Sequence, residues 1–161
     1  MMNHMRNPYF GFLFVGVLLT AVVARAFADE AQDEAIKKDR KLIEGTWRVV
    51  ALEIDGNKST DEDARKITVV NGSDGTWSLR SEGNEISKGT STIDPTKKPK
   101  TIDFSPTEGK GAGKQYPGIY ELGEKTRKLC FAPPEKARPT DFSSTSGSEQ
   151  ILVTLEREKS K

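Results

Sequence analysis

The sequence predicts an all-β domain, an eight-stranded up-and-down barrel with a short N-terminal helix and one short helical turn after the first strand. From Gly45 onward, short runs rich in Val, Ile, Thr and aromatic residues alternate with turn residues. Only one internal segment has the pattern of a helix, which excludes a doubly wound α/β fold with a helix after each strand. Barrel closure also removes exposed sheet edges, and a β-sandwich is the alternative.

Eight segments have the composition of strands, and turn residues separate them. Asp55-Gly56 predicts a turn after the first segment. Ser59 and Glu62 form a capping box, which predicts one or two helical turns over 60–66. The predicted strands are 46–54, 66–71, 75–81, 85–94, 101–105, 116–122, 126–132 and 150–158.

Residues 1–28 have the pattern of a cleavable signal peptide. Arg6 supplies a positive charge, an apolar run follows, and Ala26-Phe27-Ala28 is a small-x-small cleavage site. We therefore expect export to the periplasm or the exterior, with cleavage after Ala28. A retained membrane anchor is the alternative, but the apolar run is shorter than the roughly 20 residues that a bilayer span needs.

The expected mature chain is nearly neutral and has the length of one domain. Removing Arg6 and Arg25 from the 25 basic residues leaves 23 against 24 acidic residues. Nothing in this chain has the basic footprint of a nucleic-acid-binding protein. Residues 29–43 form a polar leader, either a short helix or a disordered segment, and 44–158 form the barrel domain. We expect a monomer without membrane contact after cleavage.

The histidine and cysteine counts exclude most catalytic and metal chemistry. The single histidine, His4, lies in the signal peptide, so the mature chain has no Ser-His-Asp triad and no metal site built on imidazole. Cys130 is the only cysteine, which excludes an internal disulfide, and its neighbours Leu129 and Phe131 predict a buried thiol. We expect no cofactor and no enzymatic activity.

Two stretches are similar to ligand-binding motifs but lack essential residues. EGKGAGK (108–114) has the glycines and lysines of a phosphate loop, yet Gln115 stands where Ser or Thr is needed, and a predicted strand follows it. We interpret this stretch as a hairpin tip. In DGNKSTDEDARK (55–66), Thr60 and Lys66 occupy the places of the glycine and glutamate of a calcium loop. This stretch therefore predicts at most a weak surface calcium contact.

Gly45-Thr46-Trp47, at the start of the first strand, is similar to the G-x-W motif that opens lipocalin barrels. The resemblance implies that Trp47 plugs the closed end of the barrel and that Arg157, late in the last strand, packs over its ring. Unlike ordinary lipocalins, this chain has no disulfide pair.

Longer blocks resemble a narrower family, the planctomycete-type lipocalin-like domain, over residues 41–158. This family is uncharacterised, so the resemblance implies a lipocalin-like barrel and brings no known activity. The blocks that carry the resemblance are GTWRVVALEIDG, IDPTKKPKTIDF, GIYEL, LCFAPPEKARPTDFSS and ILVTLERE.

The expected function is non-catalytic binding of a small apolar molecule inside the barrel. The same inward residues could instead fill the barrel completely and leave no cavity. The inward face of the first strand stays open, because Arg48, Val50, Leu52 and Ile54 form a face nearly as apolar as its alternative. The predicted lining residues are Trp47, Val49, Trp77, Leu79, Phe104, Tyr120, Phe131 and Val153. The same alternation adds Ala51, Ile102, Leu129, Ile151 and Leu155.

The alternative function is an interaction or structural module with a filled barrel. The proline-rich loop 133–148 carries Lys136, Arg138 and Phe142. Such a loop could dock on an envelope protein or glycan. It could equally fold back over one end of the barrel as a lid, with Phe142 buried.

Overall fold

The computed structural model describes residues 13–159. Residues 1–34 and 35–161 form two compact units, and helix α1 (Leu13–Ile43) passes from the first into the second. The first twelve residues of the predicted signal peptide lie outside the described part of the chain. Within residues 13–159, no helix is both long enough and apolar enough to cross a bilayer.

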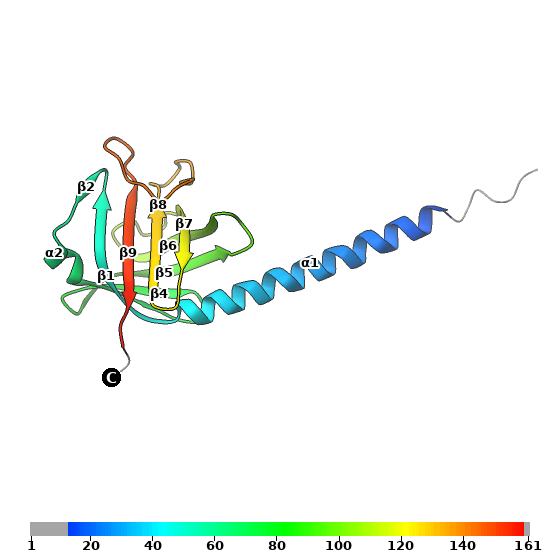
Figure 1. The fold of residues 1–161 in the computed structure, drawn as a ribbon, viewed down its shortest axis with the longest axis horizontal. Helices are drawn as coiled ribbons and strands as arrows, with labels where there is room; N and C mark the ends of the chain where they lie inside the picture. Colours follow the sequence, from blue (N-terminus) through cyan, green and yellow to red (C-terminus); the bar gives the residue numbers. More distant parts are fainter. Residues whose placement is uncertain (1–12, 160–161) are drawn as a thin grey trace, which may run out of the picture. The chain divides into compact units, whose positions relative to one another are not determined.

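The second unit is a closed antiparallel barrel (Figure 1). Eight long strands pair in up-and-down order, and β9 returns to β1, whereas the two-residue strand β2 pairs only with β1. This closure confirms the predicted barrel and excludes the sandwich. The strands are β1 (Gly45–Ile54), β2 (Asn57–Lys58), β3 (Ile67–Asn71), β4 (Thr76–Ser81), β5 (Asn84–Asp94), β6 (Lys100–Gly109), β7 (Tyr116–Leu122), β8 (Thr126–Phe131) and β9 (Ile151–Arg157).

Strand β6 is longer than the sequence predicts. The predicted strand ends at Ser105, whereas β6 continues through Pro106 to Gly109. Pro106 lies opposite Gly89, where the β5–β6 register shifts in a bulge. A bulge is one of the few sheet positions that tolerate proline, because its backbone need not donate to the ladder. The glycine- and lysine-rich stretch therefore forms the end of β6 and the tip that leads into β7, as the hairpin interpretation predicts.

The helical turn after the first strand is α2 (Asp61–Arg65), which lies beside β1 (Figure 1). Its N-cap is Thr60, whose hydroxyl accepts a hydrogen bond from the backbone N–H of Asp63. The predicted cap, Ser59, is therefore wrong by one residue. The calcium-like stretch 55–66 is split between a turn, β2 and α2 and does not form one continuous loop.

A β-bulge at Val50 determines which side chains of β1 point inward. Val49 pairs with Leu155, but Ala51 pairs with the next partner, Thr154, so Val50 has no partner of its own in β9. One extra residue reverses the alternation of a strand. The inward set is consequently Trp47 and Val49 before the bulge, and Leu52 and Ile54 after it. The predicted inward face of β1 is therefore correct before the bulge, and the alternative face is correct after it.

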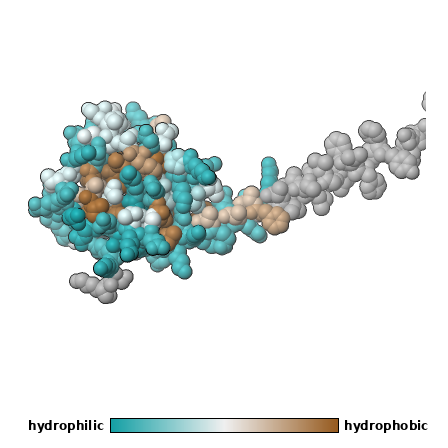
Figure 2. Space-filling view, viewed as in Figure 1, coloured by the Kyte–Doolittle hydropathy of each residue, from teal (hydrophilic) through white to brown (hydrophobic). Residues whose placement is uncertain are grey.

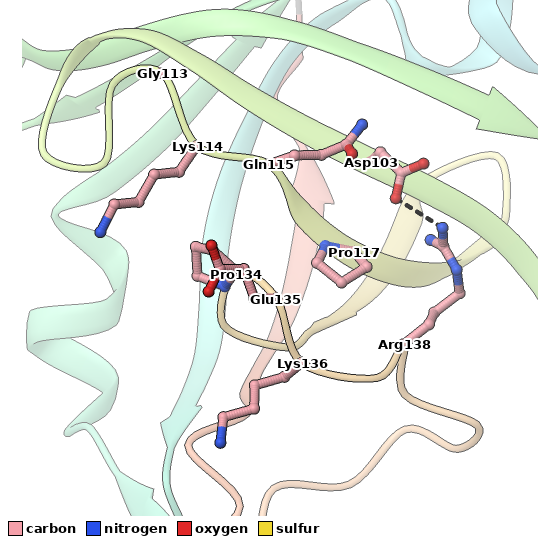
Figure 3. A pocket seen from close by; sticks show the side chains of 9 residues that line it. All are labelled: Asp103, Gly113, Lys114, Gln115, Pro117, Pro134, Glu135, Lys136 and Arg138. Atoms are coloured by element: carbon pink, nitrogen blue, oxygen red, sulfur yellow. Dashed lines mark ion pairs between the residues drawn. The ribbon is translucent and has the colours of Figure 1, made fainter.

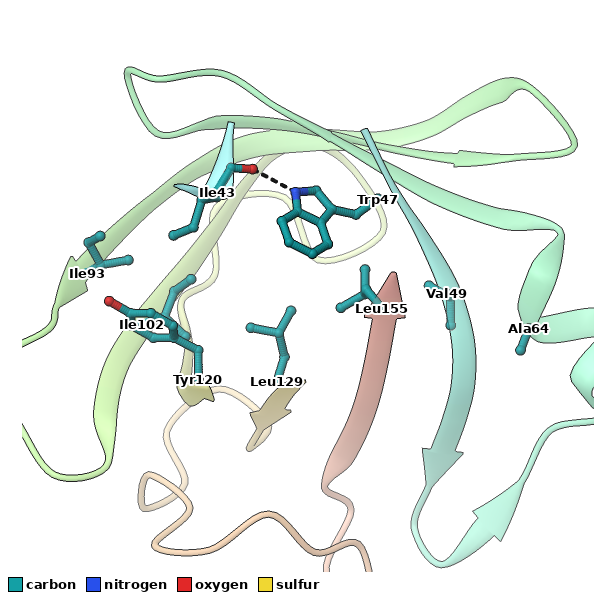
Figure 4. Close-up of a cluster of buried hydrophobic side chains, with 9 residues drawn as sticks. All are labelled: Ile43, Trp47, Val49, Ala64, Ile93, Ile102, Tyr120, Leu129 and Leu155. Atoms are coloured by element: carbon teal, nitrogen blue, oxygen red, sulfur yellow. Dashed lines mark hydrogen bonds between the residues drawn. The ribbon is translucent and has the colours of Figure 1, made fainter. Parts of the chain in front are cut away.

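The last turns of α1 cover one end of the barrel. Ile43 is 1% exposed and packs in the same buried cluster as Trp47 and Leu155. The Ile43 carbonyl accepts a hydrogen bond from the Trp47 indole Nε1 at 2.7 Å (Figure 4). Arg40 donates from Nη1 to the Ser91 hydroxyl on β5 at 2.9 Å. Residues 35–43 are thus part of the folded domain, in contrast to the disordered leader that the sequence also allows.

Shortening Ile43 tests whether this helix end stabilises the barrel. We expect Ile43→Ala to lower the free energy of unfolding by about 2–5 kcal/mol, because it removes a fully buried aliphatic side chain. Lys41→Ala, at an exposed position of the same turn, is the matched control and should change stability by less than about 0.5 kcal/mol. Urea denaturation measures both values, and equal effects would show that the helix end is only an appendage.

Candidate functional site

An apolar cavity of about 530 Å³ lies inside the barrel. Strand β1 contributes Val49, Leu52 and Ile54, and β9 contributes Ile151, Val153 and Leu155, so the cavity lies toward the end of the barrel away from the Trp47–Arg157 pair. The lining side chains are Val49, Leu52, Ile54, Ile67, Val69, Trp77, Leu79, Ile86, Ser87, Phe104, Pro106, Lys110, Tyr116, Leu129, Phe131, Ile151, Val153 and Leu155.

Three aromatic rings form one wall of the cavity. Phe104 lies edge-on to Trp77, with centroids 5.4 Å apart, and to Phe131, with centroids 4.7 Å apart. Trp77 is directly opposite Gly89, where an added Cβ would lie 2.8 Å from its ring. Phe131 is likewise opposite Gly118, where an added Cβ would lie 2.4 Å from its ring. The two glycines give the rings room to lie against the barrel wall.

The cavity opens to solvent at its rim. Ile54 is 45% exposed and Ile86 is 51% exposed, although both line the cavity. Lys110 and Tyr116, from the β6–β7 connection and the start of β7, are lining residues on the same rim. Figure 2 shows hydrophobic residues grouped among hydrophilic ones on the visible face of the barrel. The rim therefore combines apolar side chains with one cationic group.

The structure brings six of the eight predicted lining residues together around this cavity. The other two, Trp47 and Tyr120, are 0% and 1% exposed and belong to the buried core instead (Figure 4). Ala51 is exposed because the bulge turns it outward, and Ile102 is buried in the core. The residues that do line the cavity are Val49, Trp77, Leu79, Phe104, Phe131 and Val153, together with Leu129, Ile151 and Leu155.

Sequence reasoning missed the remaining lining residues for identifiable reasons. Leu52 and Ile54 were on the alternative face of the first strand, and the bulge that selects them has no glycine or proline signal. Ile67 and Val69 do alternate in the second predicted strand, so the alternation rule alone could have found them. The sequence did not assign three other lining residues to the interior. They are Pro106 in the extension of β6, Lys110 in the tip that follows, and Tyr116 at the start of β7.

The closed end of the barrel is centred on Trp47. Arg157 stacks over the indole, with its guanidinium carbon 4.3 Å from the ring centroid. Its Nη1 donates to the Glu44 carbonyl at 2.7 Å, its Nη2 to the Leu42 carbonyl, and its Nε to the Glu124 carbonyl at 3.2 Å. One side chain therefore connects the last strand, the end of α1 and the β7–β8 turn.

A buried polar group lies beside this core. The Asp39 carboxylate, on α1, accepts hydrogen bonds from the Tyr120 hydroxyl and the Lys100 ammonium, both at 2.7 Å. Asp39 is 5% exposed, so the lysine neutralises a charge that would otherwise be buried alone. Burial, followed by the hydrogen bond to Asp39, raises the pKa of Tyr120 well above its usual value.

Arg127 is a buried cation inside the barrel, and it is 1% exposed. Its Nη1 donates to the Asn71 side-chain oxygen at 3.3 Å. Burial lowers the pKa of Arg127 to about 10, which still leaves the guanidinium charged at neutral pH. Among residues 13–159, no carboxylate forms an ion pair with it.

The loop 133–148 packs against the outer wall of the barrel and does not close the cavity. Arg138 pairs with Asp103 at 2.7 Å and donates to the carbonyls of Ile102 and Gly118. Beside this anchor is an outer hollow of about 660 Å³ (Figure 3). It is lined by Asp103, Gly113, Lys114, Gln115, Pro117, Pro134, Glu135, Lys136 and Arg138.

The same loop covers Cys130 and half-buries Phe142. The Cys130 thiol donates to the Ser143 carbonyl at 3.2 Å, and burial raises its pKa. The Lys128 ammonium lies 5.7 Å from the centroid of the Phe142 ring. A thiol with a raised pKa is a poor nucleophile at neutral pH. In the described part of the chain, no group of three or more His, Cys, Asp or Glu side chains could hold a metal ion.

A comparison with solved structures adds a structural likeness. No family model and no curated protein matches the chain. A crystal structure of a DUF4847 family protein from Bacteroides vulgatus has a TM-score of 0.43 and 14% sequence identity, covering 73% of this chain and 94% of that chain. The closed barrel is therefore established by the strand pairing itself, and the resemblance to the planctomycete-type lipocalin-like family stays a prediction.

A double-mutant cycle tests the Trp47–Arg157 contact. We expect Trp47→Ala to lower the free energy of unfolding by about 3–5 kcal/mol, because it empties a large buried site. Arg157→Ala should also destabilise, and the two losses should be non-additive by about 0.5–2 kcal/mol in urea denaturation. Strict additivity would mean that the stacking carries no energy of its own.

The raised pKa of Tyr120 predicts a loss of stability at high pH. The unfolded chain releases the tyrosine proton from about pH 10 upward, whereas the folded protein retains it. This stabilising contribution is complete below about pH 10 and is lost as the pH rises further. Melting temperatures between pH 8 and 11.5 should therefore fall more steeply for the wild type than for Tyr120→Phe. If the melting temperatures of the wild type and Tyr120→Phe fell equally with pH, the raised pKa of Tyr120 would be contradicted.

Proposed function

We propose that this protein is a non-catalytic binding module that holds a small apolar molecule inside its barrel. The supporting observation is the cavity itself, whose volume lies within the roughly 300–1,000 Å³ of typical small-molecule sites. Its polar side-chain atoms are confined to Ser87, Lys110, Tyr116 and the Trp77 indole. The indole Nε1 already donates to the Thr90 carbonyl at 2.9 Å.

The cavity has the physical properties of a ligand site. An empty apolar cavity destabilises a protein, because its lining loses dispersion contacts that nothing replaces. A ligand that fills it regains those contacts and also removes its own apolar surface from water. The exposed rim at Ile54 and Ile86 provides an entry path without unfolding.

Native mass spectrometry tests the proposal directly. The full chain is expressed, purified from the envelope or medium without detergent, and measured before and after organic extraction. A bound mass of small-molecule size that extraction removes would support the proposal. The same spectrum tests the proposed export, since cleavage after Ala28 leaves Asp29 as the first residue.

Two variants of β9 make this test specific. Val153 lines the cavity, whereas Thr154 is the next residue and points to the other face of the strand. We expect Val153→Phe to lose most of the bound mass and to bind an apolar fluorescent dye about tenfold more weakly, a loss of about 1.4 kcal/mol. Thr154→Phe should retain wild-type binding. If neither wild type nor control binds any apolar compound, the proposal is wrong.

The outer hollow supports a second candidate, docking of an envelope protein or glycan on the 133–148 loop. Lys114 and Lys136 line the hollow beside the proline rings of residues 117 and 134 (Figure 3). Paired substitution of both lysines by Ser separates the two functions. It should weaken retention on envelope material if the loop is the docking surface, and it should leave dye binding in the barrel unchanged.

A further inference from the structure

Within residues 13–159, two buried side-chain donors of the barrel have no hydrogen-bond acceptor. They are the Nε of Arg127 and the side-chain nitrogen of Asn71. The Asn71 oxygen already accepts from Arg127 Nη1, so the orientation of this amide is fixed by its partner. Buried polar atoms in folded proteins are nearly always paired. Two adjacent orphan donors therefore indicate that an acceptor group belongs here.

Neither donor lines the apolar cavity, but both lie beside residues that do. Arg127 is directly opposite Leu155 in the β8–β9 ladder, and Leu129 is the next inward residue of β8; both leucines line the cavity. Asn71 is directly opposite Trp77, which also lines it. Because β9 and β1 separate β8 from β3 in the sheet, the Arg127 side chain reaches across the barrel interior to contact Asn71.

The charge around Arg127 favours an anion over a neutral acceptor. Burial is the main cause that lowers the pKa of Arg127; the nearby Tyr120 raises this pKa, and the like charge of the partly buried Arg40 lowers it. The one buried carboxylate of this region, Asp39, is occupied by Lys100 and Tyr120. A carboxylate delivered by a ligand would supply both the missing negative charge and the missing acceptor oxygens.

We propose that the ligand of the barrel is an amphipathic carboxylic acid, whose head group docks on Arg127 and Asn71 while its apolar chain fills the cavity. This inference rests on the proposed function, because it requires that the cavity holds a ligand. The head group enters first, past Leu129 and Leu155, and the chain ends at the rim near Ile54 and Ile86. Arg127 thereby selects for a negatively charged head group at the inner end of the cavity, and the aromatic wall contacts the apolar chain of the ligand.

A matched pair of probes tests the head group. Dodecanoic acid and dodecanol share one chain and differ in their charge at neutral pH. Their binding to the delipidated full-chain protein is measured at pH 7 by calorimetry or by displacement of an apolar dye. We expect the acid to bind about tenfold to a hundredfold more tightly, as a hydrogen-bonded charge pair predicts. Below the pKa of the carboxyl group, at about pH 4–5, this preference should disappear.

Substitutions at Arg127 assign the preference to this residue. Arg127→Met should abolish the difference in affinity between the acid and the alcohol. Arg127→Lys keeps the positive charge but loses the planar guanidinium with its several donors, so it should retain part of that difference. The methionine substitution removes the cost of burying a charge without a counter-ion, so this variant is expected to fold. Should it fail to fold, the wild-type comparison of the two probes and its pH dependence still decide the question.

The possible failures are distinguishable. Equal affinity for acid and alcohol would overturn the head-group proposal and leave the cavity proposal standing. Binding of neither probe would overturn both. If sodium acetate alone bound as tightly as dodecanoic acid, the site would be a plain anion site, and the amphipathic-ligand proposal would be wrong.

Discussion

The pairing of the first long strand with the last is the constraint on which the other features depend. Trp47 and Arg157 are direct partners in the β1–β9 ladder, and the guanidinium of Arg157 also stacks on the Trp47 ring and binds the carbonyls at the end of α1. Closure therefore fixes the register of the sheet, the position of the helix end and the location of the closed end at once. The cavity follows from this asymmetry, since large side chains fill one end only.

The barrel interior contains three layers of different chemistry. Trp47, Ile43 and Tyr120 fill the closed end, Arg127 and Asn71 form a polar layer next to them, and the apolar cavity extends from there to the rim. Among the buried side-chain nitrogen and oxygen atoms of residues 13–159, the Nε of Arg127 and the side-chain nitrogen of Asn71 have no hydrogen-bond partner.

Sequence reasoning located the strands well, because turn chemistry and β-rich runs are local signals. Seven residues of β7, Tyr116–Leu122, match the predicted segment at both ends. The site was only partly predictable, because which face points inward depends on long-range pairing. The bulge at Val50 reverses β1 without any local signature, and the need for Gly89 and Gly118 depends on aromatic rings and backbone atoms of the neighbouring strands. Tyr120 alternates correctly with Gly118 but lies too deep to reach the cavity.

The contacts of Arg157 also have a consequence for the order in which the protein can fold. The carbonyls of Leu42 and Glu44 receive their hydrogen bonds from a side chain more than one hundred residues further along the chain. Contacts of such high sequence separation are slow to form, since a long loop must close before they contribute any energy. The barrel is thus incomplete until β9 has been synthesised. Until then, β1 is an open sheet edge from early in synthesis and β8 is one from the time it is made, and such open edges are prone to pair with other chains.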